Sequence, residues 1–511
     1  MIDKINMIIV DKKPYRKIVV VIANQTERFM PQIYAIRSRV DYQGDSTFAA
    51  MLTTKSQDTI CALSTAPGMR AIAVLRLSGD RALEIMNQVF SKDISSAEPY
   101  SLHYGTISEN GDPIDDVVVA VFRNPKSFTG EDVIEVSCHG SEFIQGKLLR
   151  LFISKGCRTA DPGEFTMRAF SNGKMDLSQA EAVADLVASS SAAAHRLAMN
   201  QMRGNFSRKI NQLREELIHF ASMIELELDF SEEDVEFANR DELKELVNRI
   251  NAIVIDLMES FATGNAIKNG VPVAILGAPN MGKSTLLNAL LDDDRAIVSE
   301  IPGTTRDTIE DETTINGVRF RFIDTAGIRE TQDEIETIGI SKAFEKAGKA
   351  SIVLYLIDAL ESHAEEIAPT LSDLRSKIGE EQELVLIANK VDKARDMEDI
   401  KSKFAALPET VVMSATDGIG LEELRNRLVE ASKAILTEGS EVVVTNVRHY
   451  EALAKTKESL EAVLTGLDSG ITGDFLAIDI RRALHHLGEI TGEITTDDLL
   501  GNIFSKFCIG K

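Results

Sequence analysis

The sequence predicts a multidomain protein with an α+β N-terminal domain, a discontinuous all-helical domain, and a Ras-like α/β P-loop domain inserted into the helical one. Three observations lead to this fold class. Residues 58–173 show a mixed α and β pattern, whereas apolar residues recur with helical period over residues 175–230, 241–262, 447–467 and 478–487. Between these helical stretches, apolar runs alternate with helical patterns over residues 271–432, which is typical of a parallel sheet covered on both faces.

The composition indicates a globular, cytoplasmic protein. The chain has 511 residues, of which 44% are hydrophobic and 27% charged, and this length suggests three or four domains. No apolar run approaches the roughly 18 to 20 residues that a membrane-spanning helix needs. Four cysteines, Cys61, Cys138, Cys157 and Cys508, are scattered without a CxxC pair, so we expect a reducing cytosol and no disulfide framework or zinc ribbon.

The net charge limits how the protein can bind nucleic acid. A formal charge of −24 at pH 7 argues against a broad basic surface. Any contact with RNA would therefore need a local basic patch or a partner protein.

Residues 1–55 are predicted to be an N-terminal extension. The first fifty residues hold eight Lys or Arg and five Asp or Glu, which is too many acids for a typical transit peptide. We favour an upstream extension or an early start, with Met51 as the alternative first residue, over a targeting segment.

The α+β region contains several expected strands. Residues 72–77 and 132–138 read as strands, and residues 102–107 and 116–122 flank Asn110-Gly111 like the arms of a hairpin. The adjacent pair Cys138-His139 could be read as a nucleophile or metal site. Neighbouring residues of a strand point to opposite faces, however, so that reading is disfavoured.

The helical stretches flank a complete nucleotide-binding unit. Asp176 and Gln179 resemble a capping box, after which a helical period without proline continues to Phe230. Because the termini of a compact domain commonly lie close together, an insertion into a helical domain is feasible.

The central motif is Gly277-Ala278-Pro279-Asn280-Met281-Gly282-Lys283-Ser284. An apolar run, residues 273–276, precedes it and a helical pattern, residues 285–291, follows, so the motif has the strand, loop and helix context of a phosphate-binding loop. Backbone N–H groups of the loop and the helix start would hold the phosphates. Lys283 would reach the β- and γ-phosphates, and Ser284 would bind Mg²⁺.

Other motifs identify the nucleotide as GTP. They follow in order as Asp324-Thr325-Ala326-Gly327, Asn389-Lys390-Val391-Asp392 and Ser414-Ala415-Thr416. A carboxylate at Asp392 can accept hydrogen bonds from the N1–H and 2-amino groups of guanine, which adenine cannot offer. Ala415 could donate its N–H to the guanine O6, Asp324 would support Mg²⁺ through water, and Gly327 could donate to the γ-phosphate. Residues 303–307 form a loop that can bring a threonine hydroxyl to the metal.

The residue that positions the attacking water is left open by these motifs. Ile328 follows Gly327, and its side chain cannot orient water as a glutamine could. The residues on offer for hydrolysis are Glu334, Glu336, Arg306 and Arg329.

From about Asp58 to Lys511, the chain resembles the MnmE (TrmE) family of tRNA-modification GTPases. The resemblance is carried by the inserted GTPase unit and four short motifs: Phe128-Thr129-Gly130-Glu131-Asp132, Pro162-Gly163-Glu164-Phe165, Arg168-Ala169-Phe170 and the terminal Phe507-Cys508-Ile509-Gly510-Lys511. It implies a GTPase that hydrolyses GTP to GDP and phosphate and, with an FAD-dependent MnmG-type partner, adds aminomethyl or carboxymethylaminomethyl groups at C5 of the wobble uridine (position 34) of certain tRNAs. A homodimer through the N-terminal domain and a heterotetramer or larger assembly with the partner are also implied.

The resemblance assigns roles to particular residues. It implies a 5-formyltetrahydrofolate site at Arg76, Glu135, Lys174 and Lys511, a K⁺ site at Asn280, Ser299, Ile301 and Thr304, and Mg²⁺ ligands at Ser284 and Thr305. Glu336 matches the water-orienting glutamate, and Lys283 and Cys508 are the other candidate catalytic residues. The expected GTP-binding residues are Asn280, Met281, Gly282, Lys283, Ser284, Thr285, Ser299, Glu300, Ile301, Pro302, Gly303, Thr304, Thr305, Asp324, Thr325, Ala326, Gly327, Asn389, Lys390, Val391, Asp392, Ser414, Ala415 and Thr416.

The expected domains are the extension (1–55), a folate-binding and dimerisation domain (56–173), the two parts of the helical domain (174–269 and 436–511), and the GTPase domain (270–435). Two other functions remain open. One is a ribosome-assembly GTPase switch, which usually carries a KH-like RNA-binding unit whose GxxG loop is not seen here. The other is a folate-dependent transferase with a regulatory GTPase.

Overall fold

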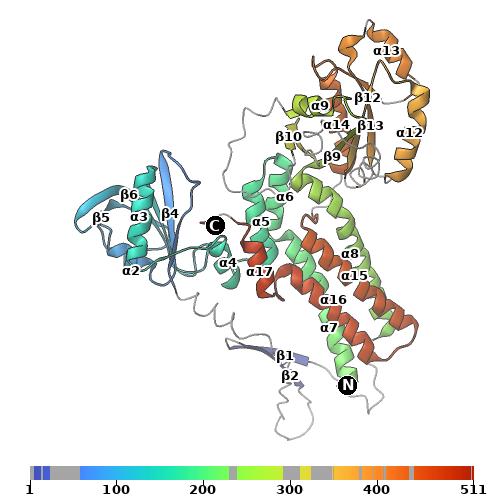
Figure 1. Cartoon of the computed structure of the whole chain (residues 1–511). Coiled ribbons are helices and arrows are strands. Elements are labelled where there is room, and N and C mark those ends of the chain that lie inside the picture. Colours follow the sequence, from blue (N-terminus) through green and yellow to red (C-terminus); the bar gives the residue numbers. More distant parts are fainter. Residues whose placement is uncertain are drawn as a thin grey trace. The chain divides into compact units, whose positions relative to one another are not determined.

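The structure is a computed structural model of the whole chain (Figure 1). It describes residues 5–12, 15–22, 58–229, 239–291, 311–323, 348, 350–378, 382–394, 396–405, 407, 410–436, 442–507 and 509–510. The chain forms two compact units, Met1–Gln57 and Asp58–Lys511. In the first unit, β1 (Ile5–Lys12) and β2 (Tyr15–Ile22) form an antiparallel hairpin.

The α+β domain is built on one mixed sheet in the order β5-β6-β7-β4-β3-β8. Its strands are β3 (Ile60–Leu63), β4 (Ile72–Ser78), β5 (Ser101–Glu109), β6 (Asp112–Phe122), β7 (Val133–His139) and β8 (Arg158–Thr159), and its helices are α2 (Ala82–Asn87) and α3 (Glu142–Ser154). The predicted hairpin is present, with Asn110 at φ 53° and Gly111 at φ 92° in the turn.

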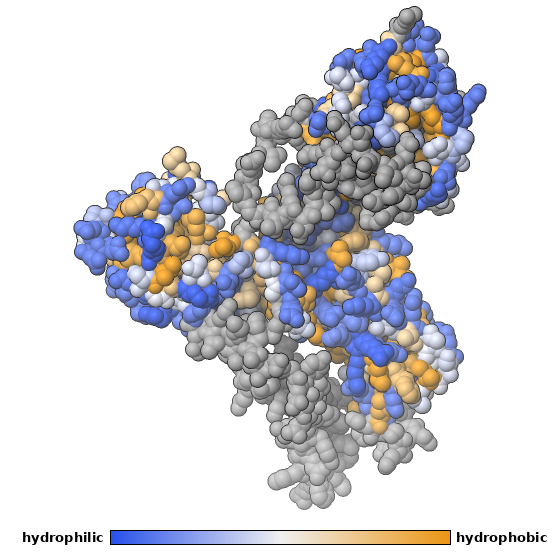
Figure 2. Space-filling view, viewed as in Figure 1, coloured by the Kyte–Doolittle hydropathy of each residue, from blue (hydrophilic) through white to orange (hydrophobic). Residues whose placement is uncertain are grey.

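The two faces of this sheet differ in polarity. Alternate residues of β4 and β7, such as Leu75, Leu77 and Val136, are buried in a core shared with α2 and α3. The residues between them, including Arg76 and Glu135, lie on the opposite face, because successive side chains of a strand alternate. Figure 2 shows apolar residues among polar ones on the surface of this domain.

The helical domain is discontinuous in sequence, as predicted. Helix α4 (Glu164–Ser171) ends the α+β domain and precedes the helical domain. The helices of the helical domain are α5 (Leu177–Ala188), α6 (Ala192–Met202), α7 (Asn205–Asp229), α8 (Arg240–Asn269), α15 (Val447–Asp468), α16 (Gly473–Thr491) and α17 (Asp497–Phe504). Its main core joins residues of α7 and α8 to residues of α15 and α16, on the other side of the insertion (Figure 1).

The segment predicted as one helical period from 176 to 230 is divided into three helices. Asp176 forms the expected capping box with Gln179. The Ser191 side chain accepts a hydrogen bond from the Ala194 N–H and so starts α6, and Gly204, at φ 77°, separates α6 from α7. The serine and glycine residues therefore break a pattern whose apolar spacing alone looks continuous.

The inserted domain has a six-stranded sheet in the order β10-β11-β9-β12-β13-β14. The strands are β9 (Val271–Gly277), β10 (Asp311–Ile315), β11 (Val318–Phe322), β12 (Ile352–Asp358), β13 (Glu383–Asn389) and β14 (Val411–Val412), with helices α9 (Lys283–Leu291), α12 (Ala364–Lys377), α13 (Met397–Phe404) and α14 (Leu421–Leu436). Only the β10–β11 pair is antiparallel, joined at Asn316-Gly317 as predicted. Buried apolar clusters lie on both faces of the sheet.

Within the described part of the chain, no helix is both long enough and apolar enough to cross a membrane.

Candidate nucleotide and N-terminal sites

The phosphate-loop motif lies between β9 and α9, where the sequence analysis placed it. Gly277 and Gly282 have φ angles of 145° and 94°, and Asn280 between them has a φ of 63°. A Cβ atom at Gly277 would lie 2.5 Å from the Leu356 carbonyl oxygen, and one at Gly282 would lie 2.5 Å from Asn389 Nδ2. Glycine is thus required by neighbouring strands and loops as well as by the curl of the backbone.

The charged and hydroxyl groups of the motif gather at the start of α9. Lys283 Nζ donates to the carbonyl oxygens of Gly277 and Ala278, at 2.7 and 2.8 Å, which holds the ammonium group over the loop. Ser284 and Thr285 are exposed in the first turn of α9, where the unpaired N–H groups of a helix start favour anions. An exposed serine hydroxyl at this position suits a magnesium ligand.

Asn389 links three segments of the predicted nucleotide site. Its side chain is only 3% exposed. Its Nδ2 donates to the Met281 carbonyl oxygen at 2.9 Å, and its Oδ1 accepts from the Ala415 N–H at 3.0 Å. The phosphate loop, the end of β13 and the loop after β14 are therefore held together by one amide.

The predicted base-reading residue is held in place by the same loops. Asp392 Oδ1 accepts a hydrogen bond from Ser414 Oγ at 2.7 Å, and Ser414 Oγ in turn accepts from the Asp417 N–H. One carboxylate oxygen of Asp392 is thus oriented by the segment that contains Ala415. Val391 is buried beside it, whereas Thr416 is exposed.

Asp358 belongs to this site and was missed from the sequence. It ends β12, opposite Asn389 of β13, and its Oδ2 forms a 2.8 Å ion pair with Lys390 Nζ. Burial acts to raise the pKa of Asp358, but the hydrogen bond and charge of Lys390 and the backbone N–H groups of Leu360 and Glu361 together outweigh it, and the pKa falls below its usual value. The sequence offered one clue to this residue: an aspartate at the carboxyl end of a predicted parallel strand, which is where ligand-binding loops gather.

Many predicted site residues lie outside the described residues. They are Ser299, Glu300, Ile301, Pro302, Gly303, Thr304, Thr305, Asp324, Thr325, Ala326, Gly327, Glu336, Cys508 and Lys511, together with the alternatives Arg306, Glu334 and Arg329 and the position Ile328. Of the expected metal ligands, the structure therefore describes only Asn280 and Ser284.

A second polar cluster lies on the α+β domain. Arg76 donates through Nε and Nη2 to Glu135 Oε1, at 2.9 and 2.7 Å, from the neighbouring strand. The Arg76 guanidinium also lies 5.7 Å from the ring centre of Phe128 and 5.5 Å from that of Phe165. It is therefore clamped between two aromatic rings and one carboxylate.

The C-terminal tail reaches this cluster. Both Arg76 Nη1 and Ser64 Oγ donate to the Gly510 carbonyl oxygen, each at 3.4 Å. A Cβ atom at Gly510 would lie 2.4 Å from the Leu63 carbonyl oxygen, so the tail packs closely against β3. Lys174 follows α4, and its side chain packs against the loop that carries Phe128: it lies next to Gly130, and its Nζ donates to the Pro125 carbonyl oxygen.

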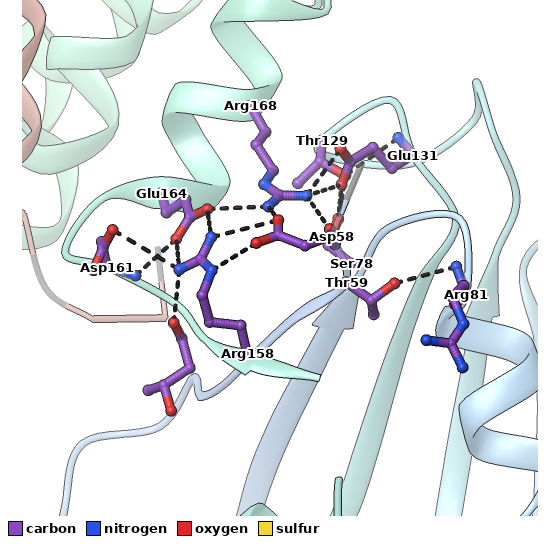
Figure 3. A network of polar contacts seen from close by, with 11 residues as sticks. Asp58, Thr59, Ser78, Arg81, Thr129, Glu131, Arg158, Asp161, Glu164 and Arg168 are labelled. Carbon is purple, nitrogen blue, oxygen red and sulfur yellow. Dashed lines mark hydrogen bonds and ion pairs between the residues drawn. The ribbon is translucent and has the colours of Figure 1, made fainter. Parts of the chain in front are cut away.

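The short motifs around residues 128–132 and 162–170 meet in a buried ion network (Figure 3). Arg168, 5% exposed, contacts Asp58 at 2.6 Å, Glu131 at 3.1 Å and Glu164 at 3.0 Å. Arg158 pairs with the same Asp58 and Glu164. Burial acts to lower the pKa of Arg168, but the charges of Glu131 and Glu164 raise it overall.

Further polar groups complete this network. Ser78 Oγ donates to Glu131 Oε2 at 2.6 Å and lies 2.7 Å from Thr129 Oγ1. The network links Asp58, which lies just before β3, to β4, β8, the loop at 129–131 and α4. Helix α4 also carries Phe165, which lies against Arg76. The motif residues therefore contact one another and hold together segments that border the Arg76–Glu135 pair.

Two family models and several relatives match this chain. The family model described as "MnmE helical domain" matches residues 177–508, and the one described as "GTP-binding protein TrmE N-terminus" matches residues 59–174. The tRNA modification GTPase MnmE of Christiangramia forsetii is 53% identical over 474 residues, covering 89% of this chain and 100% of the relative. That of Cytophaga hutchinsonii is 53% identical over 459 residues, covering 90% and 99%. That of Bacteroides fragilis strain ATCC 25285 is 51% identical over 467 residues, covering 89% and 100%.

Proposed function

This chain belongs to the MnmE family of tRNA modification GTPases, and we propose that its GTPase cycle serves the modification of C5 of the wobble uridine, position 34, in certain tRNAs. The chain hydrolyses GTP to GDP and phosphate in a reaction linked to tRNA modification. In the proposed reaction, a tetrahydrofolate one-carbon unit and an FAD-dependent MnmG-type partner produce aminomethyl or carboxymethylaminomethyl groups. The observation that carries the proposal is the bridge that Asn389 makes between the phosphate loop and the base-reading loops.

The guanine selectivity of the proposed site follows from hydrogen-bond chemistry. Asp392 has one oxygen held by Ser414, which leaves the carboxylate in a fixed position to accept from the N1–H and 2-amino groups of guanine. Ala415 is fixed at the same time by Asn389, close to where the guanine O6 would be read. A site built around such donors and acceptors rejects a base that cannot complete them.

The proposed metal ligands combine described and undescribed residues. Ser284 and Thr305 would hold Mg²⁺, and Asn280, Ser299, Ile301 and Thr304 would hold K⁺. A cation against the phosphates stabilises the negative charge that develops during hydrolysis. Lys283 binds phosphate oxygens, and Glu336 orients the attacking water in this proposal.

The Arg76–Glu135 cluster is the proposed folate site. A carboxylate at Glu135 suits the amino group and ring N–H of a pterin, and Arg76 orients it through two hydrogen bonds. Lys174 and Lys511 would bind the acidic tail of the folate. The hydrogen bond from Arg76 Nη1 to the Gly510 carbonyl oxygen supports a role for the terminal segment at this site. In this proposal Cys508 takes part in the modification chemistry.

The open face of the N-terminal sheet supports the proposed homodimer. Leu102, Tyr104 and Ile72 are 71%, 63% and 62% exposed and lie on the same face as Arg76 and Glu135. Apolar surface of this kind, continuous with a ligand site, suits a second copy of the chain. Leu102→Asp combined with Tyr104→Asp should give a monomer in sedimentation velocity, and an unchanged dimer would place the interface elsewhere.

We also propose the domain limits 56–173, 174–269, 270–435 and 436–511, after an extension at 1–55. The end of α8 at Asn269 and the start of β9 at Val271 support the boundary between residues 269 and 270. A cytoplasmic location is proposed because tRNA is the substrate and the described cysteines Cys61, Cys138 and Cys157 are free thiols.

Two experiments test the proposal. GTP hydrolysis should fall sharply when Na⁺ replaces K⁺. Equal rates in the two salts would contradict the proposed potassium site. Nucleosides of tRNA from a deletion strain should lack the wobble modification and regain it when this chain is restored. Full modification together with protein on ribosomal subunits would favour a ribosome-assembly switch, and folate binding without a tRNA phenotype would favour a transferase with a regulatory GTPase.

A further inference from the structure

One segment of this acidic protein carries no acidic residue. Between Asp185 and Glu215 the sequence contains Arg196, Arg203, Arg208, Lys209 and Arg214, and neither Asp nor Glu. The whole chain has a formal charge of −24, so this segment departs from the overall balance. It folds as α6 and the first part of α7.

Three arginines of this segment lie on one stretch of surface. Arg196 and Arg203 are seven residues apart on α6 and its C-cap, so they share a face at a rise of about 10 Å. Arg208 Nη1 donates to the Arg203 carbonyl oxygen at 3.0 Å, which places its guanidinium beside Arg203. All three residues are exposed. We call Arg196, Arg203 and Arg208 the α6–α7 basic surface.

The charge of this surface is not neutralised by the described part of the chain. No described carboxylate forms an ion pair with Arg196, Arg203 or Arg208. Arg208 Nη2 donates to the neutral Asn205 side chain. By contrast, several other cations on the surface of the helical domain have acidic partners, as in the pairs Arg249–Glu216, Lys244–Asp468 and Lys457–Glu461.

We propose that the α6–α7 basic surface binds phosphate groups of the tRNA substrate. This inference rests on the proposed function and deepens it by assigning one RNA-binding surface. Guanidinium groups pair well with phosphate oxygens, and a chain of strongly negative charge needs such a local patch to approach a polyanion. The segment between Val187 and Ile218 has no large exposed apolar side chain, whereas the centre of a protein interface is typically enriched in aromatic residues and Met.

The test compares two triple variants of the full-length protein with equal changes in charge. Arg196→Gln/Arg203→Gln/Arg208→Gln removes the basic surface. Lys244→Gln/Arg249→Gln/Lys457→Gln removes three paired cations from the same domain and serves as the control. The probe is an in vitro transcribed tRNA with an unmodified uridine at position 34, and binding is measured over a range of salt concentrations.

The expected result is quantitative. Losing three phosphate contacts should weaken binding about 100-fold at 0.15 M salt and reduce the slope of log K against log salt by roughly 2 to 3. The control variant should change both the affinity and the salt slope by much less. An Arg→Lys triple variant, which keeps the charge, should retain most of the affinity, and this comparison also covers any loss of folding in the glutamine variant.

Three results would overturn the inference. They are an unchanged affinity for tRNA in the glutamine variant, an equal loss in the control variant, and loss of binding to a partner protein with tRNA binding intact. The proposed function has a separate readout, because wobble modification is restored or not restored by the wild-type chain in a deletion strain. If the wild type restores it while the glutamine variant binds tRNA normally, only this surface assignment fails.

Discussion

Asn389→Ala should weaken guanine nucleotide binding without removing any atom expected to contact the phosphates. The amide is buried and bonds to the Met281 carbonyl oxygen and the Ala415 N–H. An alanine leaves both backbone groups without that partner. In the free protein the loops can relax so that water reaches these groups, but nucleotide binding would force them back into the closed arrangement.

The size of the effect follows from those two contacts. A buried polar group left without its partner costs about 1–3 kcal/mol. If relaxation recovers part of the cost, the loss in binding free energy should be about 2–3 kcal/mol, which corresponds to roughly 30- to 150-fold weaker binding. GTP and GDP should be affected similarly, because the bridge fixes the base loops and the phosphate loop together.

A titration of fluorescent GDP and of a nonhydrolysable GTP analogue measures this prediction. Asp392→Asn is the matched comparison, because it leaves the Asn389 bridge intact but replaces the acceptor that reads guanine. That variant should lose guanine preference while keeping the loop arrangement. Asn389→Ala with wild-type affinities for both nucleotides would refute the structural role assigned to the bridge.

Three other predictions concern stability and turnover. Arg168→Met should lower the free energy of unfolding by about 3–5 kcal/mol in urea denaturation, because the buried carboxylate of Glu131 loses its cation and Glu164 keeps only Arg158. A loss below about 1 kcal/mol would contradict this. Burial acts to raise the pKa of Glu181, but His449 and Arg448 outweigh it and hold the pKa at about 2. Its stabilisation should be present above the unfolded pKa of about 4.3 and be lost as pH falls toward 2, and Glu181→Gln should flatten that part of the stability curve. Glu336→Ala should bind GTP normally and lose turnover in a phosphate-release assay, whereas normal turnover would remove it from its role.

The GTPase domain was largely predictable because its signals are local. Buried parallel strands appear as unbroken apolar runs, and residues 273–276, 351–357 and 384–388 overlap β9, β12 and β13. The phosphate loop has a fixed spacing, and its strand and helix neighbours were visible in the sequence. Asp358 was missed because its role depends on an ion pair with Lys390, which directly follows the adjacent strand β13, and apolar periodicity does not reveal such a pair.

The helical and N-terminal domains show where sequence reasoning stops. The regular spacing of apolar residues from 176 to 230 predicted one continuous helical stretch and missed the breaks at Ser191 and Gly204. A capping serine or a left-handed glycine interrupts a helix without changing the apolar spacing. The ion network was invisible because Arg168 and Asp58 are 110 residues apart. Long-range pairs of this kind come from the fold, so the motifs were recognised from a family resemblance before their contacts were known.

The central claim is that the described loops form a guanine-specific nucleotide site. The most direct measurement is a competition titration in which GTP, GDP, ATP and ADP displace a fluorescent guanine nucleotide from the purified full-length chain. We predict displacement by GTP and GDP at concentrations far below those needed for ATP or ADP. Equal displacement by guanine and adenine nucleotides would contradict the roles given to Asn389 and Asp392.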